Sequence, residues 1–394
     1  MFVLGGLRTP FCKYIGSSKG GIFKNLSISD LSILTAKILI KNLGIEKANI
    51  EEIILGNVFQ CATDAIYEAR NIGLKLNLPM ETTALNVNRN CASGMQAIVN
   101  AVMEILVQKL DLVLVCGAEN MSQIPHIVRG LREGGSFKNF VLEDFLFESL
   151  KHKCANTSMP ETAENIAKKY NISRQEMDEY AFLSHKRTFR AFEKGIFNDE
   201  IIEVDVKIKS QNLKINRDDS VRYDISIEQL NLLPSAFKSD GMVTAGNACS
   251  ITDGAVSVLM ASENYVKKNN LKPLGKIINW QITGLEPDLM GLGPISAVKK
   301  LLQKNDLKIS DIDLFEINEA FASQYLAVEK ELNLNRDKVN VNGGAIAIGH
   351  PLGASGARIV LTLLNELKRR GGKYGIASMC VGGGQGMAIL VESS

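Results

Sequence analysis

Apolar residues along the chain follow two alternating patterns. Short continuous runs of strand length, such as IEEIILGNVF from Ile50, are bounded by polar or glycine-rich segments. Between these runs, apolar residues recur at helical spacing, as Met95, Ile98, Val102 and Ile105 do. Because alternation of strands and helices is typical of α/β proteins, we expect a largely parallel sheet covered by helices.

Several segments recur at one fixed offset in the sequence. The matching pairs begin at Ile50 and Ile312, at Ala92 and Ala354, and at Asp111 and Lys373. The differences 312 − 50, 354 − 92 and 373 − 111 all equal 262. We interpret this regularity as the duplication of one βα-rich unit. The alternative is that any two βα units share the same apolar periodicity.

The duplication predicts two halves and an insertion without a counterpart. The predicted parts are a first half of residues 1–121 plus 247–268, an inserted loop domain of 122–246, and a second half of 269–394. The strand-like run from Gly254 is expected to return to the first half. Inside the insertion, Ser173 and Glu176 form a capping box, which predicts a helix that ends at Gly195. An insertion of this length usually serves a binding site.

Composition excludes several classes of protein. A chain of 394 residues, 45% hydrophobic and 22% charged, is expected to form two or three globular domains. Its 45 basic and 43 acidic residues give 45 − 43 = +2, which argues against a nucleic-acid partner. No apolar run approaches the roughly 18 residues of a membrane span, and no secretory signal is recognised. Seven scattered cysteines favour a reducing compartment, so a cytoplasmic location is predicted. No metal-ligand spacing is found.

The first candidate for chemistry is Cys91, in the segment NRNCASGMQAIV. The small residues of CASG are expected to begin the helix that contains Met95, which would put Cys91 in its first turn. Unpaired amides and the positive end of the helix dipole would there lower the pKa of the thiol and make it a nucleophile. The alternative is that Cys91 is a small core residue, as most cysteines are.

His350 lies in the matching segment of the second half, GGAIAIGHPLGASG. The duplication therefore brings Cys91 and His350 to corresponding places, one from each half. The chain contains only four histidines, and one among dense glycines is unlike a packing residue. A neutral imidazole is the natural base for a thiol, so we expect His350 to accept the proton of Cys91.

Two further polar groups follow predicted strands. Cys380 ends an apolar run and precedes the glycines Gly382 to Gly384, whose amides could bind an oxyanion. Asn318 ends another run and could donate a hydrogen bond. Either segment, taken alone, could also be a simple turn.

Together these motifs resemble the thiolase family, and the resemblance covers nearly the whole chain. In order, the motifs are GLRTPF, NRNCASG, CGAENMS, TAEN, VTAGNACSITDGA, MGLGPI, NEAF, NGGAIAIGHPLGASG and CVGGGQG. The resemblance implies an α/β fold of duplicated βαβαβαββ halves in a layered α-β-α-β-α core, with an inserted loop domain. It implies a coenzyme A–dependent acyltransferase that cleaves 3-ketoacyl-CoA to acetyl-CoA and acyl-CoA, or condenses two acetyl-CoA to acetoacetyl-CoA.

The resemblance also implies roles for individual residues. Cys91 would carry the acyl group, His350 would activate it, and Cys380 would protonate the departing group or remove the α-proton of acetyl-CoA. One oxyanion hole would combine His350 with a water held by Asn318. The other would use the backbone amides of Cys91 and Gly382.

Binding residues and assembly are implied in the same way. The positions that match the coenzyme and acyl pocket of the family are Arg222, Phe237, Ala245, Cys249, Met159 and Met290. Coenzyme A would be substrate and product, with no permanently bound cofactor. Members of the family are dimers or tetramers, and some belong to fatty-acid oxidation complexes, so a homodimer or homotetramer is expected.

The sequence departs from the family pattern at two places, and rival functions exist. Ser158 stands where many short-chain members have a pocket histidine, and Cys249 where many have serine. A decarboxylating ketoacyl synthase shares the fold, but those enzymes pair the cysteine with two histidines or with His and Lys. A lipid-carrier relative without chemistry is the rival from another class. A dinucleotide site is not supported, because no GxGxxG follows a strand and opens a helix.

Overall fold

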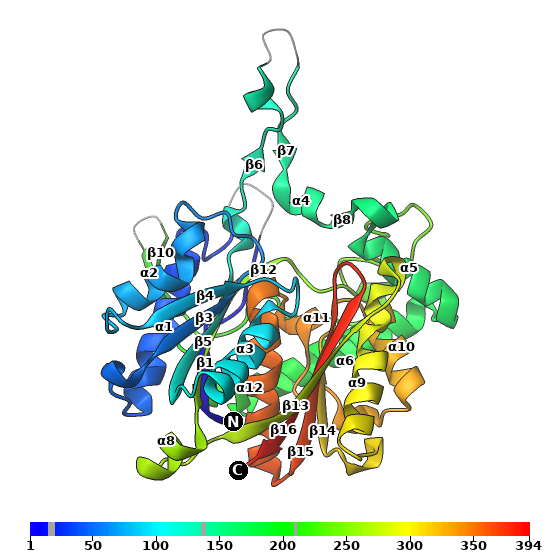
Figure 1. Ribbon diagram of the computed structural model, residues 1–394. Coiled ribbons are helices and arrows are strands. Elements are labelled where there is room, and N and C mark those ends of the chain that lie inside the picture. The colour runs from blue at the N-terminus through cyan, green and yellow to red at the C-terminus, as the bar shows by residue number, and fades with distance from the viewer. Residues whose placement is uncertain (15–19, 135–138, 209–210) are drawn as a thin grey trace.

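Two related units join edge to edge in one continuous sheet. The computed structural model describes residues 1–14, 20–134, 139–208 and 211–394 (Figure 1). The strands of the sheet are β1 (Phe2–Arg8), β2 (Cys12–Lys13), β3 (Glu52–Gly56), β4 (Thr83–Val87), β5 (Leu112–Glu119), β12 (Thr252–Ala261), β13 (Gly275–Gly284), β14 (Leu314–Ile317), β15 (Tyr374–Val381) and β16 (Gln385–Ser393). Their order is β14-β15-β16-β13-β1-β12-β5-β3-β4, and β2 pairs with β12. The seam between the units is the β1–β13 pair, where Phe2 lies opposite Lys276 and Val3 opposite Gly275.

The strand pattern confirms the duplication predicted from the sequence. In the first unit, β3 is parallel to β5, and β5, β12 and β1 follow in antiparallel order. In the second unit, β14 is parallel to β15, and β15, β16 and β13 follow in the same antiparallel order. Both ends of β5 and β15 keep the offset, since 374 − 112 and 381 − 119 equal 262. The strand from Gly254 does return to the first unit, as predicted, between β1 and β5.

Helices form a central layer and two outer layers. The helices of these layers are α1 (Ile28–Asn42), α2 (Glu68–Lys75), α3 (Ser93–Val107), α9 (Gly293–Lys304), α10 (Ala322–Leu332) and α12 (Leu352–Arg370), and the short α8 (Glu263–Lys268) and α11 (Ala345–Ile348) connect elements. Alternate residues of β5 face different layers: Val113 and Val115 share a core with α3 and α12, whereas Leu112 and Leu114 share one with α1. Because α3 and α12 lie between the two units, the layers follow the expected α-β-α-β-α order (Figure 1).

The two central helices approach each other backbone to backbone. A Cβ atom on Gly94 would lie 2.5 Å from the carbonyl oxygen of Gly353, and one on Gly356 would lie 2.4 Å from the backbone nitrogen of Met95. Any side chain at either glycine would therefore push α3 and α12 apart. Gly94 and Gly356 are themselves 356 − 94 = 262 residues apart, which gives the repeated ASG motif a structural reason.

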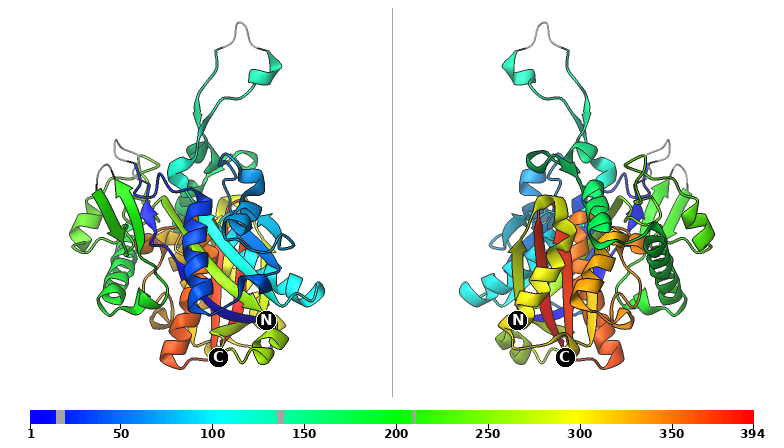
Figure 2. Two further views of the ribbon diagram at one scale, coloured as in Figure 1. Left: turned by 90° about the vertical axis from the view of Figure 1, so that its left-hand side faces the viewer. Right: turned by 90° about the vertical axis from the view of Figure 1, so that its right-hand side faces the viewer.

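The long connection between β5 and β12 is the insertion. The equivalent connection in the second unit, from β15 to β16, is only Gly382 to Gly384. The insertion contains α4 (Phe145–Ser149), α5 (Met159–Tyr170), α6 (Arg174–Glu193) and α7 (Ile227–Asn231), with the short strand pairs β6 (His126–Ile127) and β7 (Glu143–Asp144), β8 (Lys151–His152) and β9 (Thr157–Ser158), and β10 (Val204–Ile208) and β11 (Gln211–Ile215). The strands β6 and β7 project from the body of the molecule (Figures 1 and 2).

The predicted helix of the insertion is present, but it is not alone. Helix α6 begins after Ser173, whose side chain accepts from the amide of Glu176, and Gly195 follows its end in a left-handed conformation. Helix α5 was not predicted. It begins with a second capping box, formed by Ser158 and Glu161, and carries a proline in its first turn, where the missing N–H costs nothing. Residues 135–138 and 209–210 of the insertion lie outside the described residues.

One helical stretch is apolar enough to resemble a membrane span. Among the described ranges, only Asn90–Val107 is long and apolar enough by length and composition to cross a membrane. The sequence prediction that no run approaches this length was therefore too strict. This stretch includes α3, which packs between the two units, so its hydropathy is that of a core helix.

Candidate active site

A cavity of about 520 Å³ opens where the heads of α3 and α12 meet. Cys91 comes from the first unit, and His350 and Gly382 come from the second, so both units contribute to one cavity. The offset itself pairs Cys91 with Gly353, since 353 − 91 = 262, so His350 lies three residues before the position that corresponds to Cys91. Met159, Phe237, Cys249 and Met290, all predicted to contact substrate, also line this cavity.

The turn before α3 presents Cys91 to the cavity. Asn90 adopts a left-handed conformation with φ of 47°, which asparagine tolerates better than most residues. The side chain of Ser93 closes the turn, because it accepts from the amide of Arg89 at 2.9 Å and donates to the carbonyl oxygen of Asn90 at 2.7 Å. Helix α3 begins at Ser93. The prediction that Cys91 lies in the first turn of this helix was therefore wrong, because Cys91 precedes the helix.

The expected low pKa of Cys91 is also wrong for the substrate-free protein. Burial raises the pKa of the Cys91 thiol to about 11, although hydrogen bonds from the backbone amides of Gly382 and Cys91 oppose the rise. The loss of water outweighs the helix dipole because the thiol lies before the helix, partly buried against the hydrophobic core. At neutral pH Cys91 is therefore a thiol and needs a base.

The imidazole of His350 is held as such a base. Its Nδ1 atom lies 2.6 Å from the hydroxyl oxygen of Ser355, and this hydroxyl donates to the carbonyl oxygen of Pro351 at 2.9 Å. Since the serine proton is already used, Nδ1 must carry a proton and donate to Ser355, which leaves Nε2 unprotonated and able to accept. Burial and the charge of Arg358 lower the pKa of His350 to about 3, so the ring is neutral.

Asn318 lies beside Nε2, the unprotonated ring nitrogen of His350. Its Nδ2 atom is 3.4 Å from His350 Nε2, and its backbone amide donates to the carbonyl oxygen of Ser378 at 2.9 Å. The Oδ1 atom of Asn318 is buried and has no partner among the described residues. An unpaired buried acceptor is costly, and a water molecule that donates to it would remove the cost.

Cys249 and Cys380 are two further thiols within electrostatic range of Cys91. Burial raises the pKa of Cys249 to about 12 and that of Cys380 well above its ordinary value, and negative charge on Cys91 would raise both further. Cys380, near the end of β15, is fully buried and does not line the cavity, whereas Cys249 does. All three thiols are thus protonated, and Cys91 and Cys249 line the same cavity as the neutral imidazole of His350.

Gly382 forms the wall opposite Cys91. A Cβ atom here would lie 2.7 Å from Asn90 Nδ2 and 3.4 Å from the sulfur of Met159. The absence of a side chain lets the β15–β16 turn approach Cys91, so that the amides of Gly382 and Cys91 both point at the sulfur. Two converging amides are the usual form of an oxyanion hole.

Apolar residues that the sequence did not reveal cover one side of the cavity. Phe59, Met121, Phe145, Leu146, Ile251 and Leu352 form one small cluster and all line the cavity. Phe59 and Phe145 pack edge to face, with ring centroids 5.8 Å apart. These residues come from five separate segments, so no local pattern marks them. His152 also lines the cavity, so the pocket has a histidine despite Ser158.

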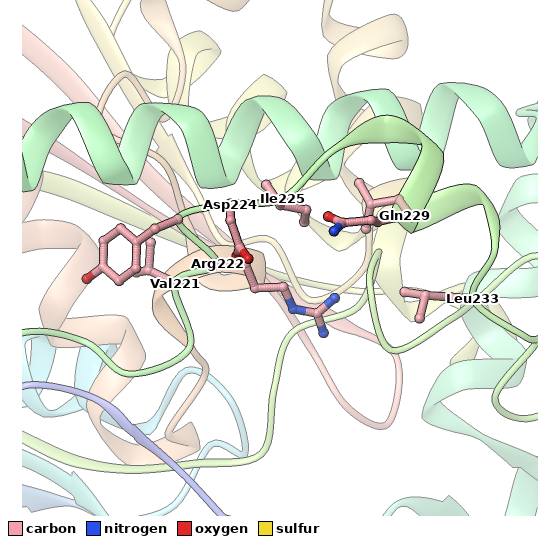
Figure 3. Close-up of a pocket in the computed structure, with 8 residues that line it drawn as sticks. Val221, Arg222, Asp224, Ile225, Gln229 and Leu233 are labelled. Atoms are coloured by element: carbon pink, nitrogen blue, oxygen red, sulfur yellow. The ribbon is translucent and has the colours of Figure 1, made fainter.

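Arg222 and Ala245 lie apart from this cavity. Arg222 lines a second pocket of about 360 Å³, together with Val221, Asp224, Ile225, Gln229 and Leu233 (Figure 3). Its guanidinium donates to the carbonyl oxygen of Ala245 at 3.0 Å, and its backbone amide donates to buried His185 at 3.2 Å. The second pocket thus offers a positive charge and an apolar surface outside the reacting groups.

Comparison with known proteins accounts for this arrangement. The family descriptions "Thiolase, N-terminal domain" and "Thiolase, C-terminal domain" match residues 1–264 and 271–393. The human mitochondrial 3-ketoacyl-CoA thiolase is 46% identical over 395 residues, covering 100% of this chain and 98% of the relative. An acetyl-CoA acetyltransferase of Chromobacterium violaceum is 43% identical over 380 residues, covering 96% of each.

Solved structures agree with the sequence relatives. The crystal structure of the human mitochondrial 3-ketoacyl-CoA thiolase matches with a TM-score of 0.96 at 46% identity, and the same enzyme in complex with CoA matches with 0.95. Both matches cover 100% of this chain and 98% of the other. The chain belongs to the thiolase family, acyltransferases that cleave 3-ketoacyl-CoA with CoA as substrate or run the reverse condensation.

Proposed function

We propose that Cys91 is the acyl-carrying nucleophile and that His350 is its base. The observation that carries this proposal is the unprotonated Nε2 of His350, whose tautomer is fixed by Ser355 and whose contact among the described residues is a long hydrogen bond of 3.4 Å from Asn318, in the cavity that Cys91 also lines. Cys91 attacks the keto carbon of a 3-ketoacyl-CoA while its proton moves to Nε2. The resulting imidazolium needs no permanent counter-ion, because a later step returns the proton.

The remaining groups serve the charges that develop. The keto oxygen becomes an oxyanion, which we assign to the backbone amides of Cys91 and Gly382. Cleavage of the bond between C2 and C3 leaves the acyl group on Cys91 and an enolate of acetyl-CoA. A water on Asn318 and the protonated Nε2 of His350 bind the enolate oxygen, and Cys380 protonates the enolate carbon. In the second stage the Cys380 thiolate takes the proton of free CoA, the CoA sulfur attacks the thioester, and the same two amides bind the oxyanion that forms again on this carbon. The Cys91 sulfur then leaves and recovers its proton from His350. Condensation of two acetyl-CoA is the same sequence reversed.

We assign coenzyme A to a path between the two pockets. Arg222, with Ala245 behind it, provides positive charge for the nucleotide end. Phe237, Cys249, Met159 and Met290 line the cavity through which the pantetheine arm reaches Cys91. The CoA complex of the human relative supports this use of the site.

We propose that the acyl group is longer than acetyl. The apolar side formed by Phe59, Phe145 and Leu146 has no other evident use, since acetoacetyl-CoA carries no tail to cover it. Each methylene buried there would contribute up to about 0.8 kcal/mol. A thiolase of fatty-acid breakdown is the role that fits this preference.

The test is thiolysis of acetoacetyl-CoA and of longer 3-ketoacyl-CoA esters by purified protein, followed as loss of the enolate absorbance. Cys91→Ala should abolish cleavage of all substrates. Cys116→Ala is the matched control, because Cys116 is a buried core cysteine that contacts Ser257 and lies in neither pocket. Equal activity in both variants, or none in the intact protein, would refute the assignment.

We also propose a homodimer that joins through β4. This strand ends the sheet, and the helices around it carry exposed apolar side chains, including Ile66, Met103 and Val107. Light scattering should give twice the mass of one chain, and Val107→Glu should shift it toward the monomer. A reducing compartment such as the cytoplasm is supported by the seven cysteines, all of which are unpaired.

A further inference from the structure

Glu119 is a buried carboxylate that the proposed reaction does not use. It ends β5, its side chain is fully buried, and four donors surround it. Oε1 accepts from Asn57 Nδ2 at 2.7 Å and from the amide of Phe59 at 3.0 Å. Oε2 accepts from the amide of Val58 at 3.1 Å and from that of Gly353 at 2.9 Å.

These contacts favour the ionised form. All four partners donate, and a protonated carboxyl would have to offer its own hydrogen to one of them. Burial raises the pKa of Glu119 to about 7, and the hydrogen bonds from Phe59, Val58, Gly353 and Asn57 act against the rise. No Lys or Arg is among these four partners, so amides and the helix dipole compensate the charge.

Glu119 connects the start of α12 to the cavity wall of the first unit. Gly353 lies in the first turn of α12, three residues after His350, and its amide has no partner within the helix. Val58 and Phe59 form part of the cavity wall. One carboxylate therefore fastens the head of the histidine helix to the first unit.

The duplication makes this contact informative. Gly353 is the counterpart of Cys91, since 353 − 91 = 262, and Glu119 is the counterpart of Val381, since 381 − 119 = 262. At the head of α3, the amide of Gly382, which follows Val381, donates to the sulfur of Cys91, where negative charge develops. At the head of α12, the equivalent place holds the carboxyl group of Glu119, which is negatively charged above its pKa of about 7.

We propose that Glu119 is a positioning residue of the acyl-transfer site, which fixes the α12 head and its His350 and keeps a negative charge within range of Cys91. Burial is the main reason that Cys91 stays protonated in the resting enzyme, and the charge of Glu119 disfavours the thiolate further. The inference rests on the proposed roles of Cys91 and His350. The ionisable groups around Cys91 are Glu119, Cys249, His350 and Cys380, with Lys151 and His152 also lining the cavity.

The test measures alkylation of Cys91 by iodoacetamide separately from thiolysis. Glu119→Gln removes the negative charge and replaces one carboxylate oxygen by an NH2 group, which donates and cannot accept. At least one of the four donors around Glu119, at the α12 head or in the cavity wall, therefore loses its acceptor. At a fixed pH below the pKa of the Cys91 thiol, alkylation should become at least about threefold faster. This corresponds to a decrease of about 0.5 unit in that pKa. Thiolysis should fall at least about tenfold in kcat, because His350 is no longer held.

Glu119→Asp separates the effect of the negative charge from the effect of the four hydrogen bonds. The shorter side chain keeps the charge but cannot meet all four donors, so kcat should fall while alkylation stays at the rate of the parent protein. If alkylation rises equally in both variants, the cause is exposure of Cys91 and the electrostatic part is overturned. If melting temperature falls while kcat and alkylation of the folded protein stay unchanged, Glu119 is only structural and the whole proposal is overturned.

Glu51→Gln provides the matched control. Glu51 accepts from the amides of Asp111 and Leu112 at the opposite end of β5 and lines neither pocket. Its substitution should change neither rate. Loss of thiolysis in the parent protein would refute the proposed function instead, and the alkylation rates would still test the charge of Glu119.

Discussion

Ser355 accepts a hydrogen bond from His350 Nδ1 at 2.6 Å and donates its own proton to the carbonyl oxygen of Pro351. This relationship decides which imidazole nitrogen is basic, because the serine hydroxyl can donate only once. The helix that starts just after His350 therefore supplies both the backbone acceptor and the serine that together fix the tautomer of the ring.

Ser355→Ala should weaken the base without removing it. The ring would lose its Nδ1 acceptor, so the tautomer with a proton on Nε2 would become populated. We expect kcat for thiolysis to fall at least about tenfold, a part of the roughly 10²–10⁴-fold that a general base contributes. Ser296→Ala, another helical serine that bonds back to its own helix at Gly293, should leave kcat unchanged.

Gly382→Ala should damage the second oxyanion hole. The new Cβ would lie 2.7 Å from Asn90 Nδ2 and 3.4 Å from the sulfur of Met159, so the Asn90 side chain or the turn has to shift, and a shift of the turn moves the Gly382 amide away from Cys91. The expected loss in kcat is about 10²–10³-fold, as for removal of one oxyanion donor. Gly284→Ala is the control, since its Cβ would meet no atom closer than 4.0 Å. An unchanged kcat in Gly382→Ala would contradict the assigned role.

Leu146→Trp should change chain-length preference more than activity. The larger ring would occupy the apolar side of the cavity next to Phe59 and Phe145. The ratio of kcat/KM for a long 3-ketoacyl-CoA to that for acetoacetyl-CoA should fall about tenfold, equivalent to burial of roughly two methylenes. Equal losses for both substrates would show that this side does not hold the tail.

His185 should make the protein sensitive to acid. Burial lowers the pKa of His185 to about 3, with the charge of Arg222 acting in the same direction. Between about pH 3 and 6.5 the unfolded chain therefore binds a proton that the folded chain refuses, and stability is lost as pH falls through this window. His185→Gln should reduce the dependence of the free energy of unfolding on pH in this window by up to about 1.4 kcal/mol per pH unit, measured by denaturant unfolding at several pH values.

The repeated offset predicted two related halves that bring Cys91 and His350 together, whereas the layered core was implied by the resemblance to the thiolase family. Two copies of one unit can pack with their equivalent helices in contact, so equivalent positions come together without any local signal. The reactivity of Cys91 could not be predicted in the same way, because the pKa depends on how much water the folded site excludes. The turn at Asn90 moves the thiol off the helix, and the sequence contains no measure of burial.

Other parts of the site were beyond sequence reasoning for geometric reasons. Phe59, Leu146 and Ile251 are far apart along the chain and form one surface only after the insertion folds over the first unit. Helix α5 was not predicted, because Pro160 suggests a break, although proline in the first turn favours a helix start.

The continuous sheet was not predicted either. Phe2 and Lys276 pair across the seam between β1 and β13, although they are 276 − 2 = 274 residues apart in the sequence. No hairpin turn connects these two strands, so no local pattern marks their pairing. Tertiary packing of the two units sets the register instead.

The seam between β1 and β13 restricts how the enzyme can move. Backbone hydrogen bonds cross it from Leu274 to Val3 at 2.8 Å and from Ile277 to Met1 at 2.9 Å. Separation of the two units would break this ladder and the contact of Gly94 with Gly353 together, so we expect the two units, and with them Cys91 and His350, to move as one body. Residues between Phe145 and Pro160 of the insertion form much of the cavity wall, so we expect substrate entry and product release to depend on motion of that segment.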